Sequence, residues 1–376
     1  MHTNWSYPNQ IKFGAGRINE LADACSDAGI LRPLLVTDRG LAGLPITEQA
    51  MQILGVGAGL FSDVDPNPNE LNLAAGLQAY REGDHDGVVA FGGGSGLDLG
   101  KMIAFMSGQS RPVWDFEDIG DWWTRADPNG IAPIIAVPTT AGTGSEVGRA
   151  SVLTNSVTHE KKIIFHPKVL PTVVICDPEL TVGMPAAITA GTGMDAFAHC
   201  LEAYCSPHFH PMSQGIALEG MRLVKEYLPR AFERPQDVEA RAQMMAAASM
   251  GAVAFQKGLG AIHALSHPIG AMYNTHHGTT NAVVMSPVLE FNASAITDRL
   301  DMAAPYLGID DGFIGFQRFV MSLNERLSIP ENLTALGIVE PDMDAIITGA
   351  LKDPSVGGNP VKMTEANTRV LLEACF

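Results

Sequence analysis

Residues 87–101 read GVVAFGGGSGLDLGK, and this stretch decides the fold class. A short apolar run passes into a turn that is almost all glycine, and a segment compatible with a helix follows. Glycines let backbone amides approach an anion closely, and the start of a helix adds the positive end of its dipole. The stretch therefore predicts a strand, a tight turn and a helix, either as a plain connection or as a site for a phosphate group.

Neither standard phosphate-binding pattern fits this turn. Ser95 stands where GxxxxGK[ST] needs its first glycine, Met102 replaces the hydroxyl residue, and the spacing of GxGxxG also fails. A second turn, VPTTAGTGSE at 137–146, follows another apolar strand. Loops at the carboxyl ends of parallel strands converge on one crevice, so the two turns together favour a bound nucleotide over plain connections. The hydroxyl groups available for such a ligand belong to Thr139, Thr140, Thr143 and Ser145.

Strands and helices alternate in the first half of the chain. The expected strands are continuous apolar runs, which suits strands buried on both faces of a parallel sheet. A helical pattern lies at 69–82, after a DPNPN turn. This is the α/β layering of a nucleotide-binding sheet. The expected strands are 33–36, 87–91, 131–137 and 173–176.

The composition and the hydrophobic spacing of the chain change near residue 184. Beyond it the segments are long, rich in alanine and methionine, and carry helical spacing. A chain of 376 residues also suggests two or three domains. We therefore expect an α/β dinucleotide-binding domain over 1–182 and an all-helical metal-binding, catalytic domain over 183–376. The expected helices of the second domain include 185–204, 212–228, 237–255 and 260–273.

Composition excludes several classes of protein. With 46% hydrophobic and 17% charged residues, the chain can bury a large core. Its net charge of −17 argues against nucleic acid or an anionic membrane as a partner. The five cysteines form no CxxC pair, which favours a reducing compartment over a disulfide framework. With neither a secretory signal pattern nor a long apolar run, a cytoplasmic enzyme is expected.

Asp38 follows the apolar run at 33–36. An acid at the end of such a strand can accept both ribose hydroxyls of an adenosine, and its charge repels a 2′-phosphate. Aspartate is equally suited to cap the start of a helix. The residue pattern leaves both interpretations open.

Five candidate metal ligands stand in two short, otherwise apolar segments. Asp195 and His199 are four residues apart, as are His263 and His267, so each pair shares a helix face; His277 follows. A lone histidine on an apolar helix is more often a satisfied core residue. Burying this many ionisable groups without a partner is costly, so a shared cation is the simplest explanation.

A divalent ion held by one carboxylate and three neutral imidazoles keeps a net charge near +1 and remains a Lewis acid. This ligand set suits Fe²⁺ or Zn²⁺, and the sequence does not choose between them. His208, His210, Cys200 and Cys205 lie close in sequence. We interpret these four as bystanders, because their spacing pairs with no second segment.

Four motifs together resemble the iron-containing (group III) alcohol dehydrogenase family. They are GGGSGLDLGK at 92–101, PTTAGTGSE at 138–146, GMDAFAHCLEAY at 193–204 and GLGAIHALSHPIGAMYNTHHG at 258–278. The likeness runs in order across nearly the whole chain. It implies an N-terminal Rossmann-like domain and a C-terminal helical domain, a dehydroquinate synthase-like architecture, with the active site in the cleft between them.

The resemblance also implies roles for individual residues. Asp195, His199, His263 and His277 are the implied metal ligands, and His267 lies near substrate and nicotinamide. Asp38 matches the acid that favours NAD over NADP, which supports its ribose interpretation. The implied contacts to the dinucleotide are Gly93, Gly94, Ser95, Asp98, Lys101, Thr139, Thr140, Thr143, Ser145 and, more weakly, Lys162.

The expected activity is NAD- and metal-dependent oxidation of small primary alcohols, or reduction of their aldehydes, by a homodimer. The alternatives are a glycerol dehydrogenase, maleylacetate reductase or semialdehyde reductase, and a nucleotide- or metal-binding sensor without catalysis. His276 departs from the family, where many members have proline. No family role is expected for the aromatic stretch FEDIGDWW at 116–123. Candidate substrate-wall residues are Gly148, Arg149, Ser151, Phe255 and Leu259.

Overall fold

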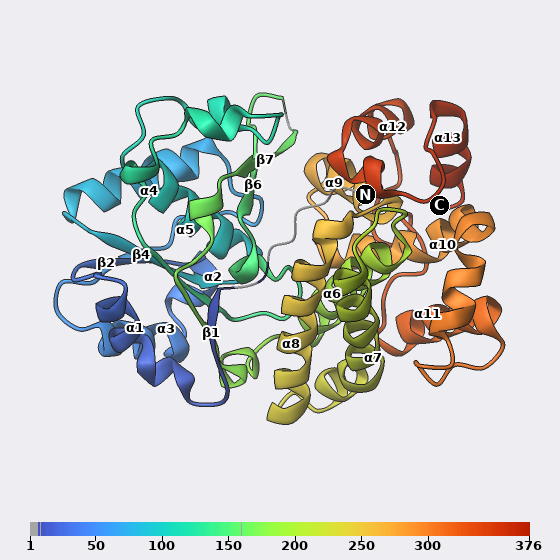
Figure 1. The fold of residues 1–376 in the computed structure, drawn as a ribbon, viewed down its shortest axis with the longest axis horizontal. Helices are drawn as coiled ribbons and strands as arrows, with labels where there is room; N and C mark the ends of the chain where they lie inside the picture. Colours follow the sequence, from blue (N-terminus) through green and yellow to red (C-terminus); the bar gives the residue numbers. More distant parts are fainter. Residues whose placement is uncertain (1–6, 8, 159) are drawn as a thin grey trace. The chain divides into compact units, whose positions relative to one another are not determined.

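The computed structural model describes residues 7, 9–158 and 160–376. These residues divide into two compact units (Figure 1). The α/β unit holds 7–140 and 144–182, and the helical unit holds 141–143 and 183–376. The predicted combination of an α/β fold with a helical C-terminal part is confirmed. That the two parts are separate domains with a boundary between residues 182 and 183 stays a prediction.

A six-stranded parallel sheet forms the centre of the α/β unit, in the order β1-β8-β5-β4-β2-β3. The four predicted strands correspond to β2, β4, β5 and β8, and every residue of these four is buried, although β5 begins at Ile134, three residues later than predicted. The edge strands β1 and β3 were not predicted, because they are short and partly exposed and so lack a continuous apolar run. The strands are Gln10–Phe13 (β1), Pro33–Val36 (β2), Gly59–Phe61 (β3), Gly87–Gly92 (β4), Ile134–Pro138 (β5) and Val173–Cys176 (β8).

Helices cover both faces of this sheet, with α4 and α5 on one side and α1 and α3 on the other (Figure 1). Successive side chains of a strand point to opposite faces. Leu34 and Val36 therefore join one core cluster, and Leu35 joins the other. The helices are Leu21–Asp27 (α1), Arg39–Ala42 (α2), Pro45–Leu54 (α3), Glu70–Glu82 (α4) and Gly94–Met106 (α5), with short 3-10 helices at Arg17–Glu20, Pro128–Gly130, Pro167–Val169 and Pro178–Thr181.

Helix α5 packs directly on β4. A Cβ atom added at Gly100 would lie 2.7 Å from the Cβ of Ala90, closer than real side chains approach. The glycine is thus required for this contact, which fixes where the turn between β4 and α5 stands.

An antiparallel hairpin, β6 (Ala150–Thr154) and β7 (Lys161–Phe165), follows the second turn. The aromatic stretch at 116–123 packs beside it. Phe116 is fully buried against Phe105, and the Trp123 ring meets the edges or faces of Phe165 and His166 at centroid distances of 6.2 and 5.8 Å. Short 3-10 helices at Val113–Phe116 and Trp122–Arg125 shape the stretch. It therefore has a packing role within the α/β unit.

In its described residues the second unit contains helices and no strand. Helix α6 is buried over most of its length and packs against α7, α8 and α10. Helix α7 runs past residue 228, where its predicted end stood, because it accommodates Pro229 in its interior. The helices are Ala186–Cys205 (α6), Pro211–Glu233 (α7), Val238–Ala254 (α8), Ala261–Tyr273 (α9), His277–Ala303 (α10), Gly312–Arg326 (α11), Met343–Lys352 (α12) and Glu365–Glu373 (α13).

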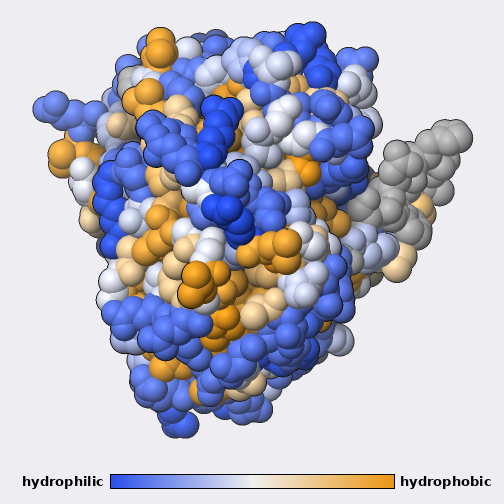
Figure 2. Space-filling view, turned by 90° about the vertical axis from the view of Figure 1, so that its left-hand side faces the viewer, coloured by the Kyte–Doolittle hydropathy of each residue, from blue (hydrophilic) through white to orange (hydrophobic). Residues whose placement is uncertain are grey.

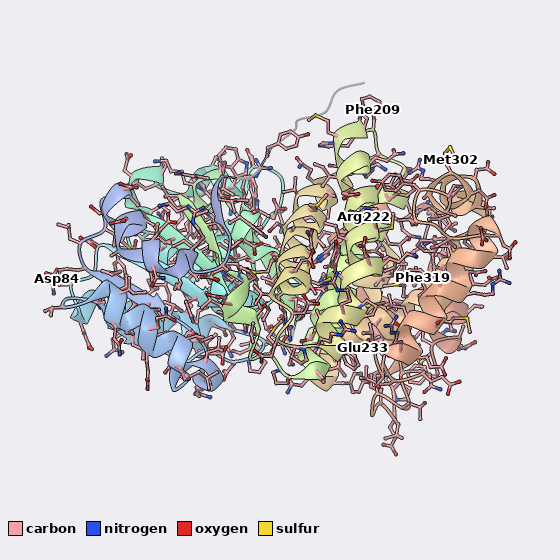
Figure 3. The ribbon with its side chains drawn as sticks, turned by 90° about the horizontal axis from the view of Figure 1, so that it is seen from below. Asp84, Phe209, Arg222, Glu233, Met302 and Phe319 are labelled. Atoms are coloured by element: carbon pink, nitrogen blue, oxygen red, sulfur yellow. The ribbon has the colours of Figure 1, made fainter. Side chains whose placement is uncertain are left out.

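Side chains of α7 form ion pairs at the surface. Arg222 contacts Glu219 and Glu226 at 2.7 Å each, and Glu233 pairs with Arg326 of α11. Figure 3 labels Arg222 and Glu233 on α7. On the face drawn in Figure 2, hydrophilic side chains predominate, and apolar ones gather toward the middle. Among the described residues, no helix has the length and apolarity that crossing a bilayer requires.

Candidate active site

Helix α6 presents three ionisable side chains on one face. Asp195, His199 and Glu202 follow each other at intervals of four and three residues, so they stack along the helix. They are only 3%, 4% and 6% exposed. Buried charged and polar groups need partners, and the partners here come from α9 and α10.

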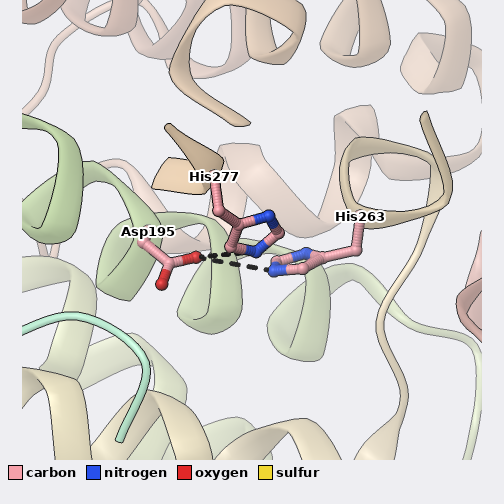
Figure 4. A group of neighbouring side chains, drawn as sticks. All are labelled: Asp195, His263 and His277. Carbon is pink, nitrogen blue, oxygen red and sulfur yellow. Dashed lines mark ion pairs between the residues drawn. The ribbon is translucent and has the colours of Figure 1, made fainter. Parts of the chain in front are cut away.

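Three imidazoles converge on one carboxylate oxygen. Asp195 Oδ1 lies 3.6 Å from His199 Nε2, 3.6 Å from His263 Nε2 and 3.5 Å from His277 Nε2. Figure 4 shows the pairs that Asp195 makes with His263 and His277. The donor atoms of Asp195, His263 and His277 all lie within 4.8 Å of one another. His199 stands just outside this compact triplet, although its Nε2 is as close to Asp195 as that of His263.

These separations fit a divalent cation. Ions such as Zn²⁺ bind nitrogen and oxygen ligands at about 2.1 Å, which places neighbouring ligands of a tetrahedron about 3.4 Å apart. The distances of 3.5–3.6 Å from Asp195 Oδ1 to three Nε2 atoms are close to that edge length. The ligand atoms of Asp195, His263 and His277 also lie within 4.8 Å of one another, whereas His199 is not part of this triplet and meets the spacing toward Asp195. The Nδ1 atom of His199 is buried without a hydrogen-bond partner, so the ring has no other polar contact to orient it than the one it makes through Nε2.

Asn281 also belongs to the cluster, and the sequence interpretation missed it. Its Nδ2 lies 2.8 Å from Asp195 Oδ1, 3.3 Å from His263 Nε2 and 3.2 Å from His277 Nε2. The signal was present in the sequence, because residue 281 stands four positions after His277 on α10 and so shares its face. The amide donates to the cluster and joins α10 to α6.

Glu202 is the second missed residue. Its Oε2 lies 2.6 Å from His263 Nδ1, and its Oε1 accepts a hydrogen bond from the backbone N–H of Ile262 at 2.7 Å. Its position three residues after His199 is the sequence signal that could have revealed it.

The histidines of the cluster differ in their affinity for protons. Burial disfavours the charge on Asp195, but the surrounding histidines hold the pKa of this carboxyl well below its usual range. Burial lowers the pKa of His199 to about 4 despite the nearby carboxylate of Asp195. Burial also opposes a charge on His263, yet Glu202 and Asp195 outweigh it and raise the pKa to about 9. A positive charge is thus favoured on His263 and disfavoured on His199, while Asp195 stays ionised.

His267 lies beside the cluster. Its ring stacks on His277 at a centroid distance of 5.3 Å, and its Nδ1 lies 2.7 Å from Asp353 Oδ2. His276 caps α10 by accepting a hydrogen bond from Thr279 N at 3.3 Å. It also packs so closely on Gly191 that an added Cβ there would lie 2.6 Å from its ring. His276 therefore helps to place the helix that begins at His277.

The two polar turns of the α/β unit stand side by side. Gly92 pairs with Pro138 in the sheet, and Thr139 N donates to Gly92 O at 2.9 Å. A Cβ added at Gly93 would lie 3.2 Å from the side chain of Thr140. The turns after β4 and β5 therefore meet at one edge of the sheet, as their sequences led us to expect. Gly93 is the N-cap residue of α5, which Gly94 and Ser95 begin.

Asp98 and Lys101 tie α5 to the second turn. Asp98 Oδ1 accepts from Ser145 Oγ at 2.5 Å, and its Oδ2 accepts from Val152 N at 3.0 Å. The ammonium group of Lys101 is fully buried and donates to the carbonyl oxygens of Ser145 and Ala150. Both side chains are engaged within the protein, so they hold the turn in place.

The remaining nucleotide candidates are spread more widely. Asp38 Oδ1 caps α2 by accepting from Gly40 N at 2.8 Å and Leu41 N at 3.0 Å, so the capping interpretation is correct. Its Oδ2 lies 3.9 Å from where a Cβ of Gly92 would stand, next to the glycine turn. The ribose interpretation is compatible with this position.

Two of the candidate nucleotide contacts, Lys162 and Thr143, make none of the hydrogen bonds described for the two turns. Lys162, on β7, is paired with Glu117 at 2.8 Å. Thr143 groups with the helical unit. Two of the candidate substrate-wall residues contact aromatic rings. The Cζ atom of Arg149 lies 5.3 Å from the ring centroid of Phe165, and the ring centroids of Phe255 and His199 lie 5.1 Å apart.

A parallel sheet whose adjacent strands end in polar turns is an architecture that binds nucleotides. A buried cluster of one carboxylate and three imidazoles is a ligand set for a catalytic divalent metal. Both features together are typical of metal-assisted enzymes that use a nucleotide cofactor.

Comparison with known proteins places the chain within that class. The family model for iron-containing alcohol dehydrogenase matches residues 8–178, and that for the C-terminal part of the same family matches residues 189–376. The chain belongs to the iron-containing alcohol dehydrogenase family. The predictions of this family and of an alcohol-oxidising enzyme are confirmed.

Individual relatives match at least 95% of the chain. A 4-hydroxybutyrate dehydrogenase of Cupriavidus necator is 40% identical, over 98% of each chain. An NAD-dependent methanol dehydrogenase of Bacillus methanolicus is 32% identical, covering 95% of this chain and 96% of the relative. The crystal structure of a 1,3-propanediol oxidoreductase superimposes with a TM-score of 0.95 at 33% identity, over 100% of both chains.

Proposed function

We propose that this alcohol dehydrogenase interconverts short primary alcohols and their aldehydes with NAD, using Fe²⁺ or Zn²⁺ held by Asp195, His199, His263 and His277. The observation that carries the proposal is the approach of three Nε2 atoms to within 3.6 Å of Asp195 Oδ1. The complete set of one acid and three histidines speaks against a glycerol dehydrogenase or a maleylacetate reductase as the better description.

A bound divalent metal supplies a Lewis acid at this centre. The chain's own residues orient it, because Glu202 and Asn281 fix the rings and the carboxylate that face it. His267 is the candidate to take up the proton that an alcohol releases. Its Nδ1 is engaged by Asp353, which leaves Nε2 for this purpose.

For the cofactor, we propose that Gly93, Gly94 and Ser95 bind the pyrophosphate at the start of α5. Backbone amides and the helix dipole favour an anion there. Asp38 would accept the ribose hydroxyls and disfavour NADP. Asp98 and Lys101 would act indirectly, by holding the second turn. Further contacts are assigned to Thr139, Thr140, Thr143, Ser145 and, more weakly, Lys162.

The relatives' names point to substrates that share a terminal hydroxymethyl group. Methanol, 1,3-propanediol and 4-hydroxybutyrate all carry one. The relative with 40% identity acts on a hydroxy acid, so we propose 4-hydroxybutyrate and its aldehyde as the first substrate pair to test.

The test is a substrate panel on metal-reconstituted protein. Metal-stripped protein is reloaded with Fe²⁺ or Zn²⁺, and NADH formation is followed with 4-hydroxybutyrate, 1,3-propanediol, methanol and glycerol. We expect activity only with added metal, NAD⁺ favoured over NADP⁺, and the highest kcat/KM for 4-hydroxybutyrate. Equal turnover without metal contradicts the metal assignment. A clear preference for 1,3-propanediol contradicts the assignment of 4-hydroxybutyrate as the substrate.

We also propose that the chain is a homodimer and that 1–182 and 183–376 are its two domains. Strand β1 lies at an edge of the sheet, where unpaired backbone groups can join a second chain. Light scattering coupled to size-exclusion chromatography measures the mass. A monomer of 39.9 kDa at micromolar concentration contradicts the dimer.

A further inference from the structure

Helix α9, which carries His263, begins without a side-chain cap of its own. The residue before its first turn is Gly260, which makes no side-chain cap hydrogen bond. The first amides of a helix have no partner within the helix and need one elsewhere. Here two distant side chains supply it. Ala261 N donates to Asn359 Oδ1 at 3.0 Å, and Ile262 N donates to Glu202 Oε1 at 2.7 Å.

The side chains of Asn359 and Glu202 leave no room for a side chain at residue 260. A Cβ atom added at Gly260 would lie 2.8 Å from Asn359 Oδ1 and 3.1 Å from Glu202 Oε1. Asn359 is itself held by Asn292, since each amide donates to the other's oxygen at 2.9 Å. All of these side chains are buried. The start of α9 is therefore clamped between α6 and the segment that carries Asn359.

Glu202 also reaches the first metal-ligand candidate of α9. Its Oε2 lies 2.6 Å from His263 Nδ1, and His263 is only 1% exposed. A carboxylate accepts hydrogen bonds and does not donate them, so the contact requires a hydrogen on Nδ1. With that hydrogen on Nδ1, a neutral ring presents a lone pair at Nε2, the atom that lies 3.6 Å from Asp195 Oδ1.

We propose that Glu202 is a positioning residue for the metal: one oxygen anchors the start of α9, and the other keeps the hydrogen of His263 on Nδ1. The proposal rests on the metal assignment made above. Partners of this kind fix the orientation and tautomer of a metal-binding histidine, and losing one typically weakens metal binding about 10–100-fold.

The variant Glu202→Gln separates this role from helix capping. Glutamate offers acceptors to two N–H donors, whereas an amide offers one oxygen and one NH₂ group. The backbone N–H of Ile262 cannot move its hydrogen, but an imidazole can. The lowest-cost arrangement therefore keeps the bond from Ile262 and turns the amide NH₂ toward His263 Nδ1. The ring hydrogen then moves to Nε2, where it obstructs the cation.

The control variant is Asn359→Ala. It removes the partner of Ala261 N but leaves the contact between Glu202 and His263. A structural defect at the start of α9 is expected in this variant without a change in the tautomer of His263. Glu202→Asp provides the conservative variant, since it keeps the charge on a side chain shorter by one methylene.

The experiment measures metal affinity and tautomer separately on the full chain. Zn²⁺ dissociation constants come from chelator competition. Nitrogen NMR on histidine-labelled, metal-free protein at pH 10, above the pKa of about 9 of His263, reports the tautomer of the neutral ring, with His263→Asn for assignment. For Glu202→Gln we expect affinity about 10–100-fold weaker and a hydrogen on Nε2. Glu202→Asp should recover part of the affinity, and Asn359→Ala should change affinity less than threefold while lowering the melting temperature of the metal-free protein.

Three outcomes overturn the proposal. They are wild-type affinity in Glu202→Gln, an unchanged tautomer in that variant, and equal loss of affinity in Glu202→Gln and Asn359→Ala, which would indicate a structural role alone. Failure of the wild-type chain to bind Zn²⁺ or Fe²⁺ contradicts the proposed function instead. The tautomer of His263 in metal-free protein is still measurable in that case, so the two failures are distinguishable.

Discussion

His267 Nδ1 lies 2.7 Å from Asp353 Oδ2, and this contact joins α9 to the end of α12. The two residues are 86 positions apart in the chain. Asp353 is held in turn by Ser355 N, which donates to its other oxygen at 2.8 Å. The ring of His267 is thereby fixed against that of His277, beside the proposed metal centre.

The pair between Asp353 and His267 predicts an acid-sensitive contribution to stability. Burial alone would raise the pKa of Asp353, but His267 and Ser355 lower it to about 2, from 3.8. A depressed carboxyl pKa stabilises the folded state above the unfolded pKa, and this stabilisation is lost as the pH falls through the folded pKa. The shift corresponds to about 2 kcal/mol.

Asp353→Asn tests this. Asparagine still accepts from Ser355 N but lacks the charge. Denaturant unfolding should show the variant less stable by about 2 kcal/mol at pH 5, with the difference shrinking between pH 4 and pH 2. The exposed Asp344→Asn serves as the control and should stay within about 0.5 kcal/mol of the wild type. A difference for Asp353→Asn that is constant over this range contradicts an electrostatic origin.

The metal centre predicts loss of bound metal when Asp195 is changed. Asp195→Asn keeps the side-chain volume but removes the negative charge that three Nε2 atoms surround. Metal affinity and kcat/KM should both fall more than about 100-fold, because removing a ligand costs more than removing a residue that orients one. His208→Ala, at an exposed histidine of the same unit, should retain both. Elemental analysis and NADH formation give the two readouts.

Asp38 predicts a separable effect on cofactor choice and stability. Asp38→Asn removes the charge that would repel a 2′-phosphate, yet asparagine caps helices about as well as aspartate. The ratio of kcat/KM for NADP⁺ to that for NAD⁺ should rise at least about fivefold, the effect of about 1 kcal/mol of like-charge repulsion. The melting temperature should hardly change. Asp38→Ala should instead lose about 1 kcal/mol of stability, through the lost cap of α2. An unchanged cofactor ratio in both variants argues against the ribose role.

Replacing Gly100 or Gly215 by alanine is expected to change the stability of the fold in opposite directions. At Gly100 the new methyl group would meet Ala90 at 2.7 Å, so α5 must move from β4, at a cost of about 1–3 kcal/mol. At Gly215, an exposed position within α7, nothing lies within 4 Å of the added Cβ atom. Alanine there should stabilise the chain by about 0.5–1 kcal/mol, because glycine is the poorer helix former. Urea unfolding of both variants measures the contrast, and the same sign in both contradicts it.

Much of the architecture was predictable from local pattern. Strands β2 and β8 end where the apolar runs at 33–36 and 173–176 end, because strands buried on both faces have no polar positions within them. The edge strands β1 and β3 were not predicted, because part of each is exposed to solvent and they therefore lack a continuous apolar run. The predicted end of α7 at residue 228 was too early, because the helix continues through Pro229 to Glu233.

The sequence by itself determined that Asp195 and His199 share a helix face, as do His263 and His267, because spacing on a helix is a local property. It also supplied the family, through motifs that keep their order along the chain. Only the tertiary structure decided that Asp353 holds His267, that Glu202 holds His263, and that Asn281 enters the cluster between Asp195 and His277. These contacts join residues 61 and 86 positions apart. Local spacing places Glu202 and Asn281 on the helix faces that carry His199 and His277, but the residues that those faces contact depend on how α6, α9, α10 and α12 pack.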